Sequence, residues 1–443
     1  MLRKEDVVKT SLYQRACRLL MVICLLPVIL LATERCSVDL SGVQGDDDSK
    51  QPSISADGRY TAFASFSSNL VKGFNVYNNA NDIYLHDSID NFNMLISAAA
   101  LPWEQADGNS SDPVISADGR YVVFATGATN LDPENNCRDG NIFLYGLGSE
   151  LECVSISTNG REGNKKSDQP DISADGSYIV FRSAADNLVP GDTNNHTDIF
   201  IHKLVGQQTV RVSLGQSGYE YNSDSYQPSI SADGLYVVFV NDGYDNNPRI
   251  IFRDWKNGKT ELISVNSADI SGNGWSNNPS ISGNASFVVF DSSSTNLVAD
   301  DTNNAVDVFI RDRETNTTER ISVNSLSVQG NDNSFHGSVS ADGRYVVFTS
   351  YADNLVADDT NGKTDIFVRD RFRGLTKRIS VNSAGEQGND FSGTPSISDD
   401  GKHVVFTSYA TNLVPGDTNG KYDVFVNEIS STNLSAVIMY LLN

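Results

Sequence analysis

The sequence predicts an all-β protein, a seven-bladed β-propeller of four-stranded antiparallel blades closed by its own N-terminal strand. The first observation behind this prediction is a serine that ends a short apolar run and recurs every 51 to 61 residues. The seven serines are Ser55, Ser116, Ser173, Ser231, Ser282, Ser340 and Ser398. A period this steady indicates one supersecondary unit repeated along the chain.

The second observation is that each repeat contains four short β-type runs. In the repeat around Ser340, the dipeptide Asp342-Gly343 predicts a tight type I′ hairpin after the first run. The following runs are rich in aromatic and β-branched residues, namely Arg344–Thr349, Asp365–Asp370 and Thr376–Val381. A unit of about 58 residues with four strands is too small to bury its own faces, which favours stacked blades over separate sandwich domains.

The third observation is that the two ends of the chain complement each other. The last repeat stops after its third strand, Asp423–Val426. The sequence expected for its fourth strand occurs near the N-terminus, where Arg35–Ser49 matches Arg378–Ser392. We therefore expect Ser37–Leu40 to lie alongside Asp423–Val426 as the fourth strand of the last blade. Such a closure leaves no open sheet edge.

The segments outside the repeats predict export. Residues 1–34 carry a basic stretch followed by the apolar run Leu19–Ala32, which predicts a secretory signal peptide or an uncleaved N-terminal anchor. Both alternatives place the propeller, residues 35–430, outside the cytoplasm, in the periplasm, at the cell surface or secreted. The C-terminal tail, residues 431–443, is too short an apolar segment to span a bilayer, and it is expected to be an extra edge strand or a loose tail.

The charge of the chain limits its partners. The sequence has 33 Lys and Arg against 56 Asp and Glu, a net charge of −23. An acidic surface repels nucleic-acid phosphate and anionic lipid, so we expect no nucleic acid and no membrane contact beyond a possible anchor. Divalent cations, glycans and protein surfaces remain as partners, or the charge serves only solubility. We expect a monomer.

Three cysteines follow the leader. Cys36 occupies the place that Ile321 and Ile379 hold in other repeats, so it is expected to point inward. Cys137 and Cys153 share the second blade, and whether they form a disulfide is left open by the sequence, since export permits the bond without demanding it.

The repeat also resembles a known family. Its pattern is Pro-x-(Ile/Val)-Ser-x-Asp-Gly-x-x-(Val/Ile)-x-Phe, followed by Asp-(Ile/Val)-Phe and later Arg-(Ile/Val)-Ser. The copies are Pro52–Phe63, Pro113–Phe124, Pro170–Phe181, Pro228–Phe239 and Pro395–Phe406, with weaker ones at Pro279–Phe290 and Gly337–Phe348. This is similar to the propeller repeat of TolB-like proteins. The resemblance implies an extracytoplasmic binding scaffold, and it transfers no partner and no catalytic residue.

Four repeats carry the loop motif Asp-Thr-Asn-x-x-x-Asp between their second and third strands. Its acidic and amide residues are Asp192, Asn194, Asp198, Asp301, Asn303, Asp307, Asp359, Asn361, Asp365, Asp417, Asn419 and Asp423. Carboxylate and amide oxygens are ligands that Ca²⁺ prefers, so the motif predicts weak calcium sites completed by backbone carbonyls, a neighbouring blade or water. The alternative is that Asp and Asn stabilise the turn by bonding nearby backbone amides.

Propeller geometry places these loops on one face. The loops after the second and fourth strands of a blade leave by the same side, so the Asp- and Asn-rich segments gather there and a protein or glycan ligand is expected to meet that face. None of the five histidines marks a position shared by all repeats, and no G-x-S-x-G elbow occurs. We therefore predict a non-catalytic scaffold, with a polysaccharide-cleaving propeller enzyme that uses carboxylates at the channel mouth as the alternative.

Overall fold

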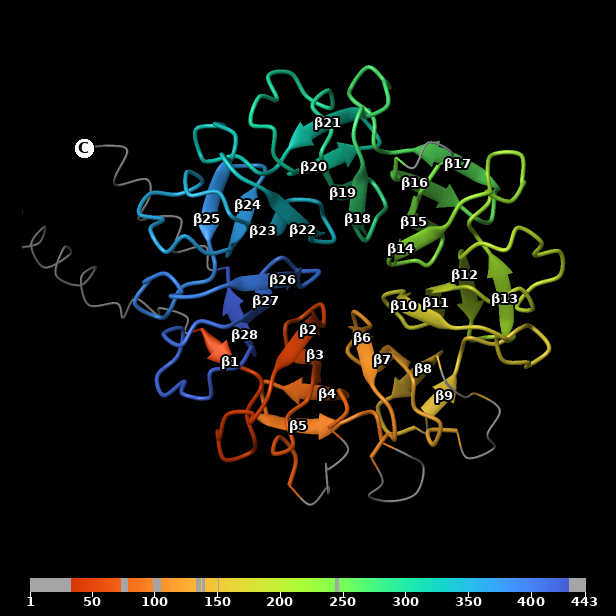
Figure 1. Cartoon of the computed structure of the whole chain (residues 1–443), viewed down its shortest axis with the longest axis horizontal. Helices are drawn as coiled ribbons and strands as arrows, with labels where there is room; N and C mark the ends of the chain where they lie inside the picture. Colours follow the sequence, from red (N-terminus) through yellow and green to blue (C-terminus); the bar gives the residue numbers. More distant parts are fainter. Residues whose placement is uncertain are drawn as a thin grey trace, which may run out of the picture.

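The computed structural model is a ring of seven four-stranded antiparallel sheets, which confirms the predicted fold class (Figure 1). The structure describes residues 33–72, 79–98, 105–132, 137, 140–149, 151–243 and 247–429. Nearly all of the predicted leader and all of the predicted tail lie outside these residues. Within the described part of the chain, no helix is long and apolar enough to cross a membrane.

Each blade begins at the central channel and ends at the rim. The innermost strands are β2 (Ser49–Ile54), β6 (Ser110–Ile115), β10 (Ser167–Ile172), β14 (Ser225–Ile230), β18 (Ser276–Ile281), β22 (Ser334–Val339) and β26 (Ser392–Ile397). The second strands are β3 (Tyr60–Ser65), β7 (Tyr121–Thr126), β11 (Tyr178–Ser183), β15 (Tyr236–Asn241), β19 (Phe287–Ser292), β23 (Tyr345–Ser350) and β27 (His403–Ser408). We number the blades 1 to 7 in this order.

The outer half of each blade holds the third and fourth strands. The third strands are β4 (Asp82–Asp87), β8 (Asn141–Gly146), β12 (Asp198–Lys203), β16 (Arg249–Asp254), β20 (Asp307–Asp312), β24 (Asp365–Asp370) and β28 (Asp423–Glu428). The fourth strands are β5 (Phe92–Leu95), β9 (Leu151–Cys153), β13 (Gln208–Arg211), β17 (Lys259–Leu262), β21 (Thr317–Arg320), β25 (Leu375–Arg378) and β1 (Glu34–Arg35).

The N-terminal strand closes the ring, as predicted, because β1 pairs with β28 in blade 7. The expected pairing residues were wrong: Glu34 and Arg35 lie opposite Val426 and Phe425, whereas Ser37–Leu40 was expected there. The chain leaves the sheet after Cys36, since Val38 forms a bridge with Gln44 further along its own loop. Every fourth strand in the ring is followed by the same kind of local bridge, which ends its pairing early.

The hairpins between the first and second strands also differ from expectation. Type I′ requires positive φ at both central residues, but Asp342 keeps a negative φ and only Gly343 is left-handed, at +71°. The Gly343 amide donates to the Ser340 carbonyl, so the turn is type I followed by a left-handed glycine. A Cβ on Gly343 would come within 2.1 Å of the Phe287 ring in the preceding blade, which explains the need for glycine there.

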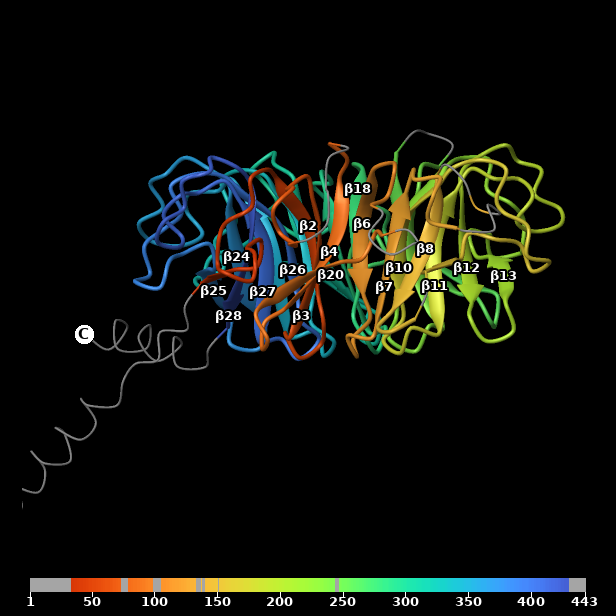
Figure 2. The same cartoon turned by 90° about the horizontal axis from the view of Figure 1, so that it is seen from below.

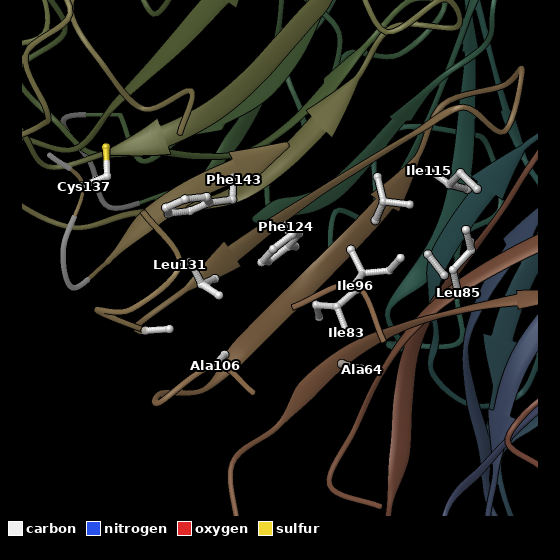
Figure 3. Close-up of a cluster of buried hydrophobic side chains, with 13 residues drawn as sticks. Ala64, Ile83, Leu85, Ile96, Ala106, Ile115, Phe124, Leu131, Cys137 and Phe143 are labelled. Atoms are coloured by element: carbon white, nitrogen blue, oxygen red, sulfur yellow. The ribbon is translucent and has the colours of Figure 1, made fainter. Parts of the chain in front are cut away.

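The apolar core lies between the blades, in seven clusters that each join two neighbours. Between blades 1 and 2, Ile83 and Ile96 pack toward Ile115 and Phe124 (Figure 3). Within blade 2, Phe124 and Phe143 stack with their centroids 6.3 Å apart. A single blade therefore buries its faces only against its neighbours, as the size of the repeat requires.

The two faces of the ring are unlike (Figure 2). We call the face that carries the loops after the second and fourth strands the loop face, and the face that carries the two hairpin turns of each blade the turn face.

Candidate functional site

The predicted calcium loops place their acids around an arginine. In blade 6, Arg378 at the end of β25 lies 3.2 Å from an Asp359 oxygen and 3.6 Å from an Asp365 oxygen. Asn361 donates to Asp365 at 2.9 Å, and Gln387 accepts a hydrogen bond from Arg378. We call this set the arginine network.

Three other blades repeat the arginine network. The sets are Asp192, Asn194 and Asp198 with Arg211; Asp301, Asn303 and Asp307 with Arg320; and Asp417, Asn419 and Asp423 with Arg35. In each set the asparagine donates to the second aspartate of the loop, at 2.9 to 3.2 Å. The structure thus brings each predicted triplet together, blade by blade, around one guanidinium.

Burial dominates the electrostatics of these networks. It raises the pKa of Asp359 to about 6, while the positive charge of Arg378 acts in the opposite direction. Burial also raises the pKa of Asp365, which the Ser380 hydroxyl and Arg378 oppose. Charged carboxylates in this environment need a cationic partner, and the arginine supplies one.

This donor set fits a guanidinium rather than a calcium ion. Asn361 uses its amide oxygen to accept the Lys363 backbone N–H at 2.9 Å, a contact of the kind expected if the loop only stabilises its own turn. Across the described residues, no group of three or more His, Cys, Asp or Glu side chains is arranged to hold a metal ion. Calcium binding at these loops stays a prediction.

Blade 2 links the same two segments by a covalent bond. Cys137, in the loop after the second strand, and Cys153, at the end of β9, form a disulfide with a Cα–Cα distance of 6.4 Å. The pairing that the sequence left open is therefore formed. Cys36 is buried and free, as its position predicted.

The sequence analysis missed a ring of polar residues in the central channel. In each innermost strand a β-bulge places the third residue in the left-handed region, with φ between +46° and +55°. The seven residues, which we call the channel ring, are Gln51, Asp112, Gln169, Gln227, Asn278, His336 and Thr394. Together with the residues that follow them they line a cavity of about 420 Å³. The sequence signal that could have revealed the channel ring is the polar residue directly before the proline or glycine in the first strand of each repeat.

Part of the channel ring is bonded from blade to blade. Gln51 donates to Asp112 at 2.6 Å, and Gln227 donates to Asn278 at 2.6 Å. In blades 6 and 7 the contacts are different. His336 packs edge-on against Phe335 of its own blade, and Thr394 bonds Thr407 of its own blade at 2.8 Å. Both His336 and Thr394 are exposed to the channel.

Two acidic residues that line the channel closer to the turn face depart from the repeat pattern. Asp171 stands where other blades have serine or valine, and Asp399 stands where they have alanine or glycine. Both line a narrower cavity of about 180 Å³. Burial raises the pKa of Asp171 to about 6, although Asp171 accepts the Ile230 backbone N–H at 2.9 Å. Burial raises the pKa of Asp399 as well.

Known proteins resemble the chain in fold only. No protein-family model matches it, and no curated protein sequence does. The structure described as oligogalacturonate lyase in complex with manganese superposes with a TM-score of 0.53 at 14% identity, over 91% of this chain and 96% of that one. The β-propeller domain of the trilobed protease from Pyrococcus furiosus gives 0.53 at 13% identity, over 87% and 99%.

TolB structures are also among the similar folds. The putative TolB from Agrobacterium tumefaciens is 15% identical, over 76% of this chain and 94% of that one, with a TM-score of 0.42. The strand pairing of the chain itself makes the protein a closed seven-bladed β-propeller. The Pyrococcus domain is described as having an open velcro topology, whereas β1 closes blade 7 here.

Proposed function

We propose that the protein is an extracytoplasmic, non-catalytic scaffold that binds a protein or glycan at its loop face. The observation that carries the proposal is the channel ring. Each innermost strand runs from the loop face toward the turn face, so its third residue lies in the loop-face half of the channel. The 420 Å³ cavity is therefore reached from the loop face.

The backbone of the channel ring supports a binding role. A left-handed conformation costs a residue other than glycine about 1–2 kcal/mol, and the chain uses a non-glycine residue at this position in every blade. Backbone strain of this kind concentrates at ligand-binding sites. A residue other than glycine supplies a side chain there that can contact the ligand. Some ring side chains serve to link neighbouring blades, but His336 and Thr394 are exposed to the channel and contact residues of their own blades.

The arginine networks and the disulfide fit this role as supports. They tie the loop after the second strand to the fourth strand in blades 2, 3, 5, 6 and 7. A rigid loop face loses less conformational entropy when it binds a ligand.

Site-specific photo-crosslinking tests the proposal. A photoreactive benzoylphenylalanine would replace Tyr351 on the loop face or Phe372 on the turn face, in cells that express the full chain. We expect covalent adducts from position 351 and not from position 372. Adducts formed only from position 372, or from neither position, would contradict a loop-face scaffold.

The proposed location has its own test. In an oxidising compartment the Cys137–Cys153 bond persists, whereas a reducing cytoplasm keeps such thiols free. Cells would be treated with a thiol-blocking maleimide at lysis and the cysteines mapped by mass spectrometry. Blocked Cys137 and Cys153 in freshly lysed cells would contradict an extracytoplasmic location.

The alternative, a polysaccharide-cleaving enzyme, draws on Asp171 and Asp399. They come from blades 3 and 7 and line one cavity, and a carboxylic acid with a raised pKa suits a general acid. The bond from the Ile230 amide to Asp171 instead gives this carboxylate a role in joining blades 3 and 4. Release of reducing ends from a polysaccharide, lost in both Asp171→Asn and Asp399→Asn, would establish the enzyme in place of the scaffold.

A further inference from the structure

An arc of exposed aromatic side chains borders the channel on the loop face. Phe66, Trp275, Tyr351 and Tyr409 are 37–45% exposed, and we call them the aromatic arc. Each lies at the loop-face end of the two innermost strands of its blade. The amides of Tyr351 and Tyr409, for example, donate to carbonyls just before β22 and β26, at 2.9 and 2.8 Å.

The arc occupies one side of the ring. Its members come from blades 5, 6, 7 and 1, which are consecutive around the channel (Figure 1). Phe66, Tyr351 and Tyr409 follow the second strands of their blades, whereas Trp275 precedes the first strand of blade 5. At the position after the second strand, blades 2, 3, 4 and 5 carry Gly127, Ala184, Asp242 and Ser293. The aromatic surface is therefore a local departure from the repeat, and the packing of the blades does not require it.

More aromatic rings support the arc from behind. The Phe335 ring lies 6.0 Å from that of Tyr351, and the Tyr422 ring lies 5.1 Å from that of Tyr409. Such contacts fix the exposed rings in place, which reduces the entropy they lose on binding a ligand.

The channel ring offers its exposed polar groups on the same side. His336 belongs to blade 6, as Tyr351 does, and Thr394 belongs to blade 7, as Tyr409 does. The ring residues of blades 4 and 5, Gln227 and Asn278, bond to each other instead. Blades 6 and 7 thus each carry an exposed aromatic ring and an exposed polar residue of the channel ring.

We infer that the aromatic arc and the adjacent part of the channel ring bind a neutral oligosaccharide, an inference that rests on the proposed loop-face function. Sugar rings present apolar C–H faces that stack on aromatic side chains, and hydroxyl groups that pair with amide, hydroxyl and imidazole groups. The net charge of −23 disfavours an acidic polymer.

Binding of defined oligosaccharides tests the inference. Isothermal titration would use the full mature chain with neutral hexasaccharides of glucose, mannose, xylose and N-acetylglucosamine, and with hexagalacturonate as the acidic comparison. We expect at least one neutral hexasaccharide to bind and hexagalacturonate to fail. Tyr351→Ala and Tyr409→Ala should each weaken that binding at least tenfold.

The control is Phe372→Ala, which removes a more exposed aromatic ring, 68% exposed, from the turn face. It should leave affinity unchanged. The arc variants should still unfold cooperatively, at a somewhat lower melting temperature, because the rings of Tyr351 and Tyr409 are more than half buried and contact other aromatic rings. The inference fails if no neutral hexasaccharide binds, if the arc variants bind as well as the control, or if a proline-rich peptide takes the arc instead.

The loop-face scaffold and the oligosaccharide inference can be contradicted by different results. A protein crosslinked from position 351, with no hexasaccharide bound, would overturn the oligosaccharide inference and leave the loop-face scaffold standing. Crosslinks from position 372 alone would overturn the scaffold, and the inference with it.

Discussion

Blades 2 and 6 hold the same loop in place by different chemistry. Arg378 and Cys153 are each the last residue of a fourth strand, opposite Phe367 and Phe143 in the neighbouring third strand. Cys137 lies four residues before the third strand, where blade 6 has Asn361. A disulfide in one blade therefore replaces a buried ionic network in the other, which shows that two different chemistries can link the same two segments.

The two links stabilise the folded protein in different ways. The arginine network buries charges, and these destabilise the fold strongly when one partner is removed. The disulfide acts chiefly on the unfolded chain and is indifferent to pH and salt. The predictions below test this difference, from the largest expected effect to the smallest.

Removing the arginine of blade 6 should have the largest effect. Arg378→Ala leaves Asp359 and Asp365, whose side chains are 5% and 0% exposed, without their cation. We expect a loss of about 3–5 kcal/mol in the free energy of unfolding, measured by urea denaturation. The control is Arg373→Ala in the same blade, where a 49% exposed arginine should cost less than about 0.5 kcal/mol. Equal losses in the two variants would show that the network does not stabilise the blade.

Removing the disulfide of blade 2 should cost about 3 kcal/mol, the value for a closed loop of about 15 residues. The bond spans a sequence separation of 16. Dithiothreitol should lower the melting temperature of the wild type to that of the double variant Cys137→Ser/Cys153→Ser. The double variant should not respond to the reductant. A response of equal size in both proteins would place the sensitive group elsewhere.

Blade 1 has neither link, and its acid should titrate near neutrality. Leu95 takes the place of the arginine, Ser97 donates to Asp82 at 2.6 Å, and burial raises the pKa of Asp82 to about 6 from 3.8. Because the folded pKa lies above the unfolded one, the stability gained from the protonated acid is complete below about pH 4 and is lost as the pH rises through 6.

The difference in melting temperature between the wild type and Asp82→Asn should therefore change with pH. From pH 5 to pH 8 the wild type should lose stability relative to the variant, because asparagine carries no charge to bury. Parallel profiles for the two proteins over this range would mean that Asp82 does not titrate there.

Calcium should have the smallest effect. If the Asp-Thr-Asn loops bind Ca²⁺ in addition to their arginine, stability should rise by about 0.4 kcal/mol per site when the ion concentration equals the dissociation constant. Calorimetry in millimolar Ca²⁺ and in EDTA measures this shift, and Asp359→Asn should reduce it. Identical melting in both buffers would leave the arginine as the sole cation of these loops.

Much of the fold could be predicted because the repeat itself encodes it. The serine that recurs at the first hairpin turn of each repeat gave the number of blades, and the match between Arg35–Ser49 and Arg378–Ser392 gave the closure. The exact pairing of β1 could not be predicted, because the local bridge from Val38 to Gln44 depends on how the chain leaves the sheet.

The candidate site could be predicted only in part. The sequence located the acidic loops, but the arginine that meets Asp359 lies 19 residues further along the chain, and only the pairing of β24 with β25 brings it there. The channel ring was missed because the polar residue before each proline or glycine does not by itself reveal the bulge that turns it toward the channel. The aromatic arc likewise could not be predicted, because its residues come from four blades that become neighbours only in the folded ring.

The sequence by itself determined the blades, their number and the way the ring closes, since these follow from local patterns and one match between the ends. Tertiary structure decided what the acids bond to and which side chains share the channel. The physical reason is that charge pairing and cavity lining are relations between distant segments, which a repeat specifies only after its copies have packed around a common axis.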